Sequence, residues 1–257
     1  MNKFFLIIIL AFIIIFKGYT QDEKYYTIGI KTGYAKYAVY DELITPLIYS
    51  QKYIPFQFVY KEEHSKKLEI TDISYTKLQL RPSATHPNYI DHTGIAMHYN
   101  HYRKELNYTK NRLNIIPGFG FTGYLYDNQQ FYKTQAFSID YLYNNKQYQL
   151  TFSINLSANI DFEINEKSKM NFTIDMPVIG YLVRPTYSAR SNWKLSADNI
   201  KTINKYMLTN IVLDYVSLIT KKLSFSVGLE ANLYSVKFPY QYNSLTKSLK
   251  IGLYYAF

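Results

Sequence analysis

The chain has 257 residues, no cysteine and a formal net charge of +10. The absence of cysteine excludes a disulfide framework, a thiolate metal site, a cysteine nucleophile and a lipoprotein anchor. A basic surface suits nucleic acid or anionic lipid, but the Lys and Arg residues are scattered and no recognised nucleic-acid motif is present. We therefore expect no nucleic-acid partner and favour solvation and anionic lipid headgroups as the role of the charge.

The N-terminal segment has the pattern of a secretory signal peptide. Lys3 precedes the apolar run FFLIIILAFIIIF at residues 4–16, and the small residues Gly18 and Thr20 follow. This run is shorter than the roughly 20 apolar residues that a membrane-spanning helix needs. We expect cleavage after Thr20; an uncleaved N-terminal anchor is the alternative.

The rest of the chain is a succession of predicted β-strands. In chain order they are 26–34, 53–63, 67–80, 92–105, 112–126, 134–143, 148–163, 170–178, 206–219, 223–233 and 248–257. The clearest is YQLTFSINLSANIDFE at 148–163, in which apolar and polar residues alternate at every position. In 67–80 the alternation changes phase between Tyr75 and Leu78, which predicts a β-bulge.

Two kinds of connection separate these strands. Short turns are predicted at 64–67, 144–146 and 220–222, and long loops at 38–52, 81–91, 184–205 and 236–246. The second half of 184–205 has the composition of a helical turn. No composition break divides the chain into two domains.

The length and composition of the strands indicate which face is buried. Several regular runs span 9 to 16 residues, whereas strands of soluble sheets are mostly about 5–6 residues long and a tilted membrane strand needs about 9–11. The polar faces are rich in Ser, Thr, Asn and Gly, and tyrosines gather at the ends of the runs, as in aromatic girdles. We therefore expect apolar faces outward in lipid; a soluble secreted sandwich or lipocalin-like binding protein is the alternative.

The C-terminal segment SLKIGLYYAF carries a family resemblance. Its alternate positions Leu249, Ile251, Leu253, Tyr255 and Phe257 match the last strand of Gram-negative outer-membrane β-barrels, which ends in an aromatic residue. The chain resembles that family, and in composition its uncharacterised Bacteroidota barrels. The resemblance implies that these five residues are an assembly signal read by the barrel-assembly machinery. It also implies a signal peptide at 1–20, a barrel domain at 21–257 and a place in the bacterial outer membrane.

The expected fold is all-β, a transmembrane antiparallel up-and-down barrel. The pattern yields eleven segments, and single-chain bacterial barrels generally have an even number of strands. We expect twelve strands, with one hidden around 160–206, and ten as the alternative.

The histidines suggest chemistry but do not share a site. His86, His92, His98 and His101 lie within sixteen residues. His92 and His98 share a strand face but lie about 20 Å apart, too far for one metal ion. Outer-membrane acyl hydrolases place a nucleophilic Ser two residues from an outward His, but Asn100 occupies that position after His98.

Polar residues at inward positions are the remaining candidates. They are Lys31, Asn155, Asn159, Asp161, Asp175, Asp214, Glu230, Asn232 and Lys250. Such residues line a diffusion path or bind a solute, or they fill the interior as a hydrogen-bonded plug.

The sequence thus predicts a monomeric narrow pore or structural barrel without a catalytic site, a cofactor or a metal. Its expected partners are outer-membrane lipids, lipopolysaccharide and the barrel-assembly machinery. A lipid-active enzyme is the alternative function.

Overall fold

The computed structural model describes residues 24–41, 45–82, 88–136, 139–183, 200–202, 205–237 and 241–257. The expected signal peptide at 1–20 lies outside these residues. Most of the expected helical turn in 184–205 does so too, and the residues described there include the short strand β10, Ile200–Thr202.

The described chain is almost entirely β-strand. The strands are β1 Tyr25–Asp41, β2 Thr45–Tyr53, β3 Phe56–Glu63, β4 Lys67–Leu80, β5 Tyr89–Arg103, β6 Tyr108–Lys110, β7 Leu113–Ala136, β8 Ile139–Asn165, β9 Ser168–Val183, β10, β11 Tyr206–Leu218, β12 Leu223–Val236 and β13 Tyr242–Ala256; the 3₁₀-helix η1 spans Lys104–Leu106.

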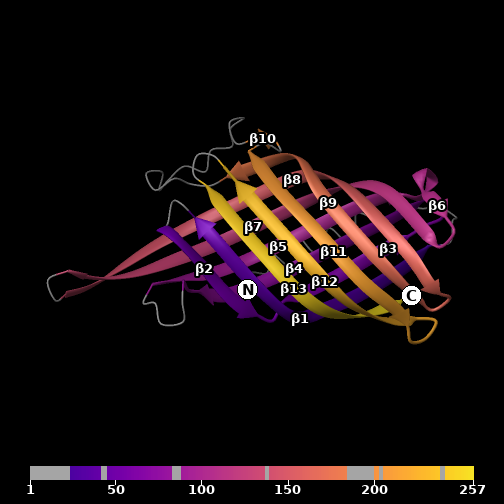
Figure 1. The fold of residues 1–257 in the computed structure, drawn as a ribbon, viewed down its shortest axis with the longest axis horizontal. Coiled ribbons are helices and arrows are strands. Elements are labelled where there is room, and N and C mark those ends of the chain that lie inside the picture. The colour runs from indigo at the N-terminus through magenta and orange to yellow at the C-terminus, as the bar shows by residue number, and fades with distance from the viewer. Residues whose placement is uncertain are drawn as a thin grey trace.

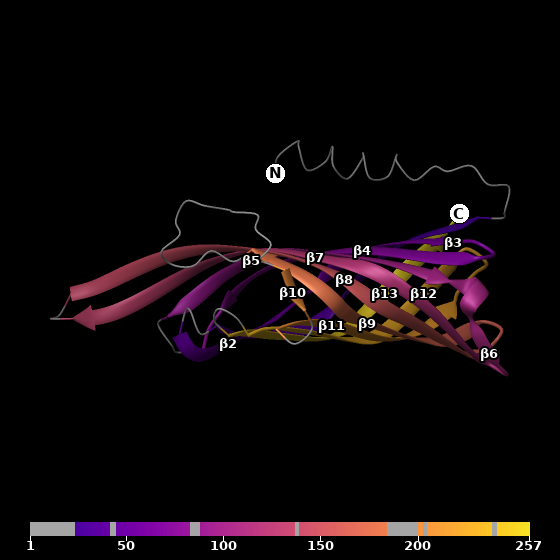
Figure 2. The same cartoon turned by 90° about the horizontal axis from the view of Figure 1, so that it is seen from above.

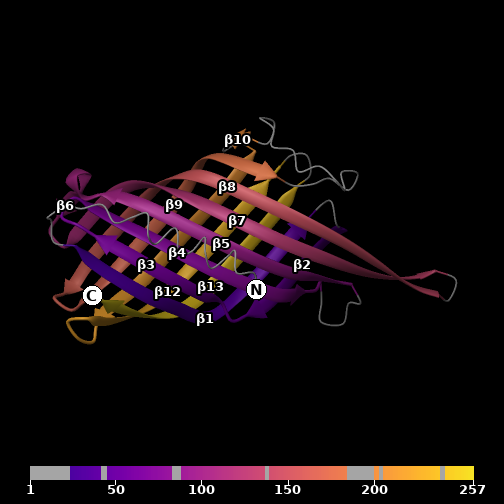
Figure 3. The same ribbon diagram turned by 180° about the vertical axis from the view of Figure 1, so that it is seen from behind.

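The strands close into an antiparallel barrel (Figures 1 and 3). Around the ring the order is β1, β3, β4, β5, β7, β8, β9, β11, β12 and β13, and β13 pairs with β1 from Thr27↔Ala256 to Asp41↔Tyr242. Each strand in the ring pairs with its sequence neighbour there, so the connections are hairpins. Ring closure leaves no open sheet edge along the wall.

β2 and β3 occupy one position in the wall. Both pair with β1, β2 toward Asp41 and β3 toward Tyr25, and the break between them falls at Pro55. Pro55 has no N–H to donate to a ladder, and its carbonyl accepts a 2.9 Å hydrogen bond from the Thr32 hydroxyl.

The ring therefore has ten strands, the smaller of the two expected numbers, and the short β6 and β10 lie outside it. This corrects the expectation of a twelve-stranded ring. The predicted strand 134–143 does not exist as a separate unit because β7 ends at Ala136 and β8 begins at Ile139. The predicted turn at 144–146 is also wrong, since Asn144 pairs with Phe131 inside the β7–β8 ladder.

The predicted loop 38–52 is also shorter than expected. β1 continues to Asp41, and β2 begins at Thr45. Alternation fails to reveal these strand ends because inward positions there carry apolar residues, including Val39 and Tyr49.

The alternation in β8 has its apolar face outward. Leu156 is 64% exposed, whereas its neighbour Asn155 is 1% exposed. Apolar side chains therefore cover the outer wall, and polar side chains fill the interior, which is the reverse of a water-soluble barrel.

The predicted β-bulge in β4 is absent. β4 pairs with β3 and β5 in continuous register. The change in pattern arises because Leu78 and Leu80 are buried inward residues, at 9% and 1% exposure, while Tyr75 faces outward. The interior itself becomes apolar toward this end of the barrel.

β7 and β8 extend beyond the rest of the wall. β5 pairs with β7 only as far as Phe131, and β9 pairs with β8 only from Leu150 onward. Beyond these points the two strands pair only with each other, and they project as a two-stranded ribbon at one end (Figures 1 and 2). We call this the ribbon, residues 132–149. It lies at the end of the barrel that has the longer connections between strands, which we call the loop end. The first residues of β1 and the last residues of β13 lie at the opposite end, which we call the turn end.

Candidate functional site

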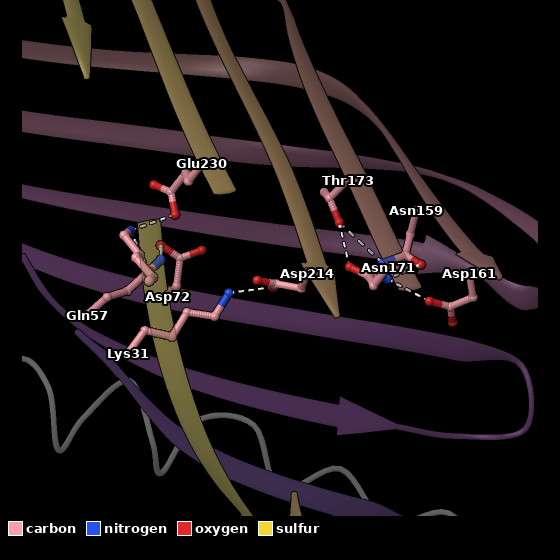
Figure 4. Close-up of polar contacts among 10 residues, drawn as sticks. Lys31, Gln57, Asp72, Asn159, Asp161, Asn171, Thr173, Asp214 and Glu230 are labelled. Carbon is pink, nitrogen blue, oxygen red and sulfur yellow. Dashed lines mark hydrogen bonds and ion pairs between the residues drawn. The ribbon is translucent and has the colours of Figure 1, made fainter. Parts of the chain in front are cut away.

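The polar interior is the most distinctive feature of the barrel, and it contains an ion pair between two strands that are not neighbours. Lys31 on β1 and Asp214 on β11 are both buried, and the Lys31 Nζ lies 2.5 Å from the Asp214 Oδ2 (Figure 4). Gly228 on β12 makes room for this pair, since a Cβ at that position would overlap the Asp214 carboxylate. A pair so shielded from water interacts far more strongly than one on the surface.

A second ion pair lies beside the first. Lys250 on β13 donates to Glu230 on β12 at 2.6 Å and to the Gln57 side chain on β3 at 2.8 Å. Gln57 in turn donates to Asp72 on β4 at 2.9 Å, and Asn232 donates to Glu230 at 2.8 Å. This network links β12 and β13 to β3 and β4 through side chains, across the intervening strand β1 (Figure 4).

A separate group of polar residues lies on β8 and β9. Asn171 donates to Asp161 at 2.6 Å and to Asn159 at 3.0 Å, and Lys169 pairs with Asp161 at 2.9 Å. The Asn159 amide lies 3.4 Å from the Thr173 hydroxyl. Figure 4 shows Asn159, Asp161, Asn171 and Thr173 gathered on these strands, apart from Glu230 and Lys31.

Asp175 differs from the other buried acids in its partners. It is 1% exposed, and its Oδ2 accepts bonds from the amides of Asn100 and Asn210, both at 3.3 Å. Within the part of the chain that the structure describes, no cation pairs with it, and its Oδ1 accepts no hydrogen bond. Asn155 is held separately, donating to Thr122 at 2.7 Å.

Toward the loop end a tyrosine-rich layer closes the interior. Its buried members are Tyr37, Val39, Tyr49, Leu78, Leu80, Ile90, Ala96, Tyr124, Tyr126, Leu182, Tyr206, Leu208, Tyr234, Val236 and Tyr242. The Tyr37 and Tyr242 hydroxyls lie 3.0 Å apart, and the His92 ring packs 5.0 Å from the rings of both Tyr37 and Tyr126. Sequence reasoning missed this layer, although the phase change in β4 was its signal.

Little space remains between the polar network and the tyrosine-rich layer. A cavity of about 50 Å³ lies there, with Tyr37, Asp72, His98 and Glu230 among its lining residues. That volume holds a few water molecules, since one water needs roughly 10–15 Å³ measured in this way.

The histidines are hydrogen-bonded structural residues. The His92 ring lies 2.6 Å from the Asn128 side-chain oxygen, and His98 lies 3.1 Å from the Thr122 hydroxyl. Because His98 faces inward, it does not occupy the outward position that the acyl-hydrolase hypothesis requires. His101 faces outward and meets Glu69 at 2.9 Å. His86 lies outside the described residues, among which no three acidic, His or Cys side chains could jointly hold a metal ion.

The C-terminal strand presents its apolar residues to the outside. Leu249, Ile251, Leu253, Tyr255 and Phe257 are each between 45% and 60% exposed. The Phe257 N–H donates to the Tyr26 carbonyl at 2.9 Å, and its ring stacks on Tyr26 with the centroids 5.8 Å apart. The chain therefore ends within the seam that closes the ring. No helix in the described ranges is long and apolar enough to cross a membrane.

Comparison with known proteins shows which structures the fold resembles. No protein-family model and no curated protein sequence matches the chain. The outer membrane protease OmpT from Escherichia coli is similar in structure, with a TM-score of 0.55 and 12% identity over 93% of this chain and 98% of that one. The fold is thus that of an outer-membrane β-barrel.

Two further structures match less well. The attachment invasion locus protein Ail of Yersinia pestis has a TM-score of 0.36 and 8% identity over 89% of this chain and 98% of its own. The toluene transporter TodX of Pseudomonas putida has a TM-score of 0.37 and 6% identity over 92% and 90%. The resemblance to Bacteroidota barrels stays a prediction.

Proposed function

We propose that the protein is an integral barrel of the bacterial outer membrane, and that it is a structural or accessory barrel with a filled interior. The observation that carries the proposal is the combination of an apolar outer wall with an interior occupied by ion pairs. Exported by its N-terminal segment, the chain would span the membrane with its turn end in the periplasm, as short turns do in this class of barrel.

The outer wall supports the membrane location. Ile251 and Leu156 are 60% and 64% exposed, and exposed apolar residues occur on each of the consecutive strands β8, β9, β11, β12, β13 and β1. Apolar patches on soluble monomers rarely exceed a few hundred Å². A wall of this kind is stable when lipid covers it.

The interior favours a closed barrel over an open channel. The Lys31–Asp214 pair joins β1 to β11, the Lys250–Glu230 pair joins the adjacent strands β13 and β12, and the tyrosine-rich layer lies above them. A hydrated solute would have to pass both these side chains and the tyrosine-rich layer. We therefore favour the structural role over the narrow pore.

Heat-modifiability and conductance test this proposal on the full chain. We expect a detergent-extracted sample to migrate faster on an SDS gel unboiled than boiled, and to produce no conductance steps in a planar bilayer. Recovery as a soluble protein that folds without detergent would contradict the membrane location. Steady single-channel conductance would contradict the filled interior and favour the narrow pore.

A further inference from the structure

Three lysines form a row across adjacent strands on the outer wall. Lys36 on β1 pairs directly with Lys247 on β13 and with Lys52 on β2. All three side chains are exposed and share the outward face. Like charges placed directly opposite in a sheet repel and destabilise it. We call Lys247, Lys36 and Lys52 the lysine row.

The lysine row lacks the acidic partners that several other lysines have. Among the described residues no carboxylate forms an ion pair with any of the three. At the turn end, by contrast, Lys104 pairs with Glu63 and Lys67 pairs with Glu69. The Lys52 ammonium lies 5.8 Å from the centre of the Tyr34 ring. The row is therefore a concentrated positive charge that no carboxylate of the described residues neutralises by an ion pair.

The row also lies at a specific height on the wall. Below Lys247, β13 presents only apolar residues outward, from Leu249 to Phe257. Ten residues of strand, tilted by about 40°, rise roughly 25 Å, which is the height of the apolar band of an outer-membrane barrel. With Phe257 at the periplasmic boundary, the lysine row reaches the opposite boundary, where lipid headgroups lie.

We propose that the lysine row binds the phosphate groups of lipopolysaccharide in the outer leaflet. This inference rests on the proposed function, because it requires the barrel to span the membrane with its loop end outward. The phosphates would supply the missing counter-charge to all three ammonium groups. Strands in a sheet lie about 4.7–4.9 Å apart, so neighbouring ammonium groups can meet one phosphate together.

Binding of lipopolysaccharide to matched variants tests the proposal. The protein in zwitterionic detergent is titrated with lipopolysaccharide and, separately, with the same glycolipid after its phosphates are removed. The test variant carries Lys36→Gln, Lys52→Gln and Lys247→Gln. The control carries Lys167→Gln, Lys221→Gln and Lys222→Gln, which remove the same charge from exposed lysines at the turn end.

We expect the test variant to bind lipopolysaccharide roughly 100-fold more weakly than wild type, since each of the three lysines near an anionic surface contributes about fivefold. The control should keep wild-type affinity, and dephosphorylated lipid should bind all proteins equally weakly. Rescue by Lys→Arg at the three positions would agree with charge recognition. Equal losses in test and control, or no loss in either, would overturn the proposal.

The heat-modifiability of each sample separates this test from that of the proposed function. Wild type and both variants should all run faster unboiled. If they do and the affinities do not differ, the lysine row is not a lipid site although the membrane barrel stands. If wild type shows no difference in gel migration between unboiled and boiled samples and stays soluble without detergent, both the proposed function and this proposal are wrong.

Discussion

Lys31 and Asp214 are 183 positions apart in the sequence and form a 2.5 Å ion pair inside the barrel. They meet because the ring closes: β1 pairs with β13, β13 with β12 and β12 with β11. The pair thus links the first and last parts of the chain, on either side of the seam.

Removal of one partner of this pair should be costly. Lys31→Met leaves the buried Asp214 carboxylate without its cation, and such a change destabilises a fold by about 3–5 kcal/mol. Replacing both, Lys31→Met with Asp214→Leu, should cost clearly less than the sum of the single changes. Urea unfolding in detergent micelles measures this. Strictly additive losses would show that the two side chains do not interact.

Asp175 offers a matched comparison with Asp214. Both are buried aspartates, but Asp175 accepts its hydrogen bonds from the amides of Asn100 and Asn210. Asp175→Asn strands no cation, so it should destabilise the barrel by about 1 kcal/mol or less, within the range for a neutral hydrogen bond. Asp214→Asn should cost several times more, because it leaves Lys31 buried and unpaired. Equal unfolding free energies for the two variants would contradict this difference.

Alternation predicted the strands but not all of their ends. β8 and β13 were recognisable because every inward residue in their central parts is polar or small. Where the interior becomes apolar, as at Tyr37 and Leu78, inward and outward residues have the same polarity, and the alternating pattern no longer indicates which residues face inward. The expectations of a loop at 38–52 and a bulge in 67–80 both arose in that part of the barrel.

The ion pairs inside the candidate site could not be predicted from the sequence. The alternation of apolar and polar residues places four side chains on the polar face of their strands: Lys31, Asp214, Glu230 and Lys250. It does not say which cation meets which acid, because that depends on the number of strands and on their register in the closed ring. The lysine row is similar: Lys36, Lys52 and Lys247 become neighbours only once β1 pairs with both β2 and β13.

The ribbon should be dispensable for folding. Residues 133–145 pair only within the β7–β8 hairpin, and the ladders to β5 and β9 end before them. Replacement of 133–142 by a two-residue Asn-Gly turn, which keeps the pairing of Tyr132 with Tyr143, should leave the heat-modifiability unchanged and the unfolding free energy within about 1 kcal/mol of wild type, since shortening a loop changes its closure entropy little. Loss of the compact unboiled band would show that the ribbon stabilises the wall.

A substitution at Phe257 should affect assembly in cells more than the stability of the folded barrel. Its ring is 58% exposed and stacks on Tyr26, so Phe257→Ser removes one aromatic pair worth about 0.5–1.5 kcal/mol. The backbone bonds between Phe257 and Tyr26 remain, and the variant should refold in detergent with nearly the wild-type yield. If the terminal strand is an assembly signal, the same variant should accumulate several-fold less folded barrel in the outer membrane of cells.

A matched variant distinguishes this signal from a general effect of polarity on the wall. Leu156→Ser removes an exposed apolar side chain of β8, far from the chain terminus. We expect it to assemble better in cells than Phe257→Ser although both refold in detergent. Equal cellular yields for the two variants would show that Phe257 contributes only as a lipid-facing side chain, and that the closing strand carries no special information for assembly.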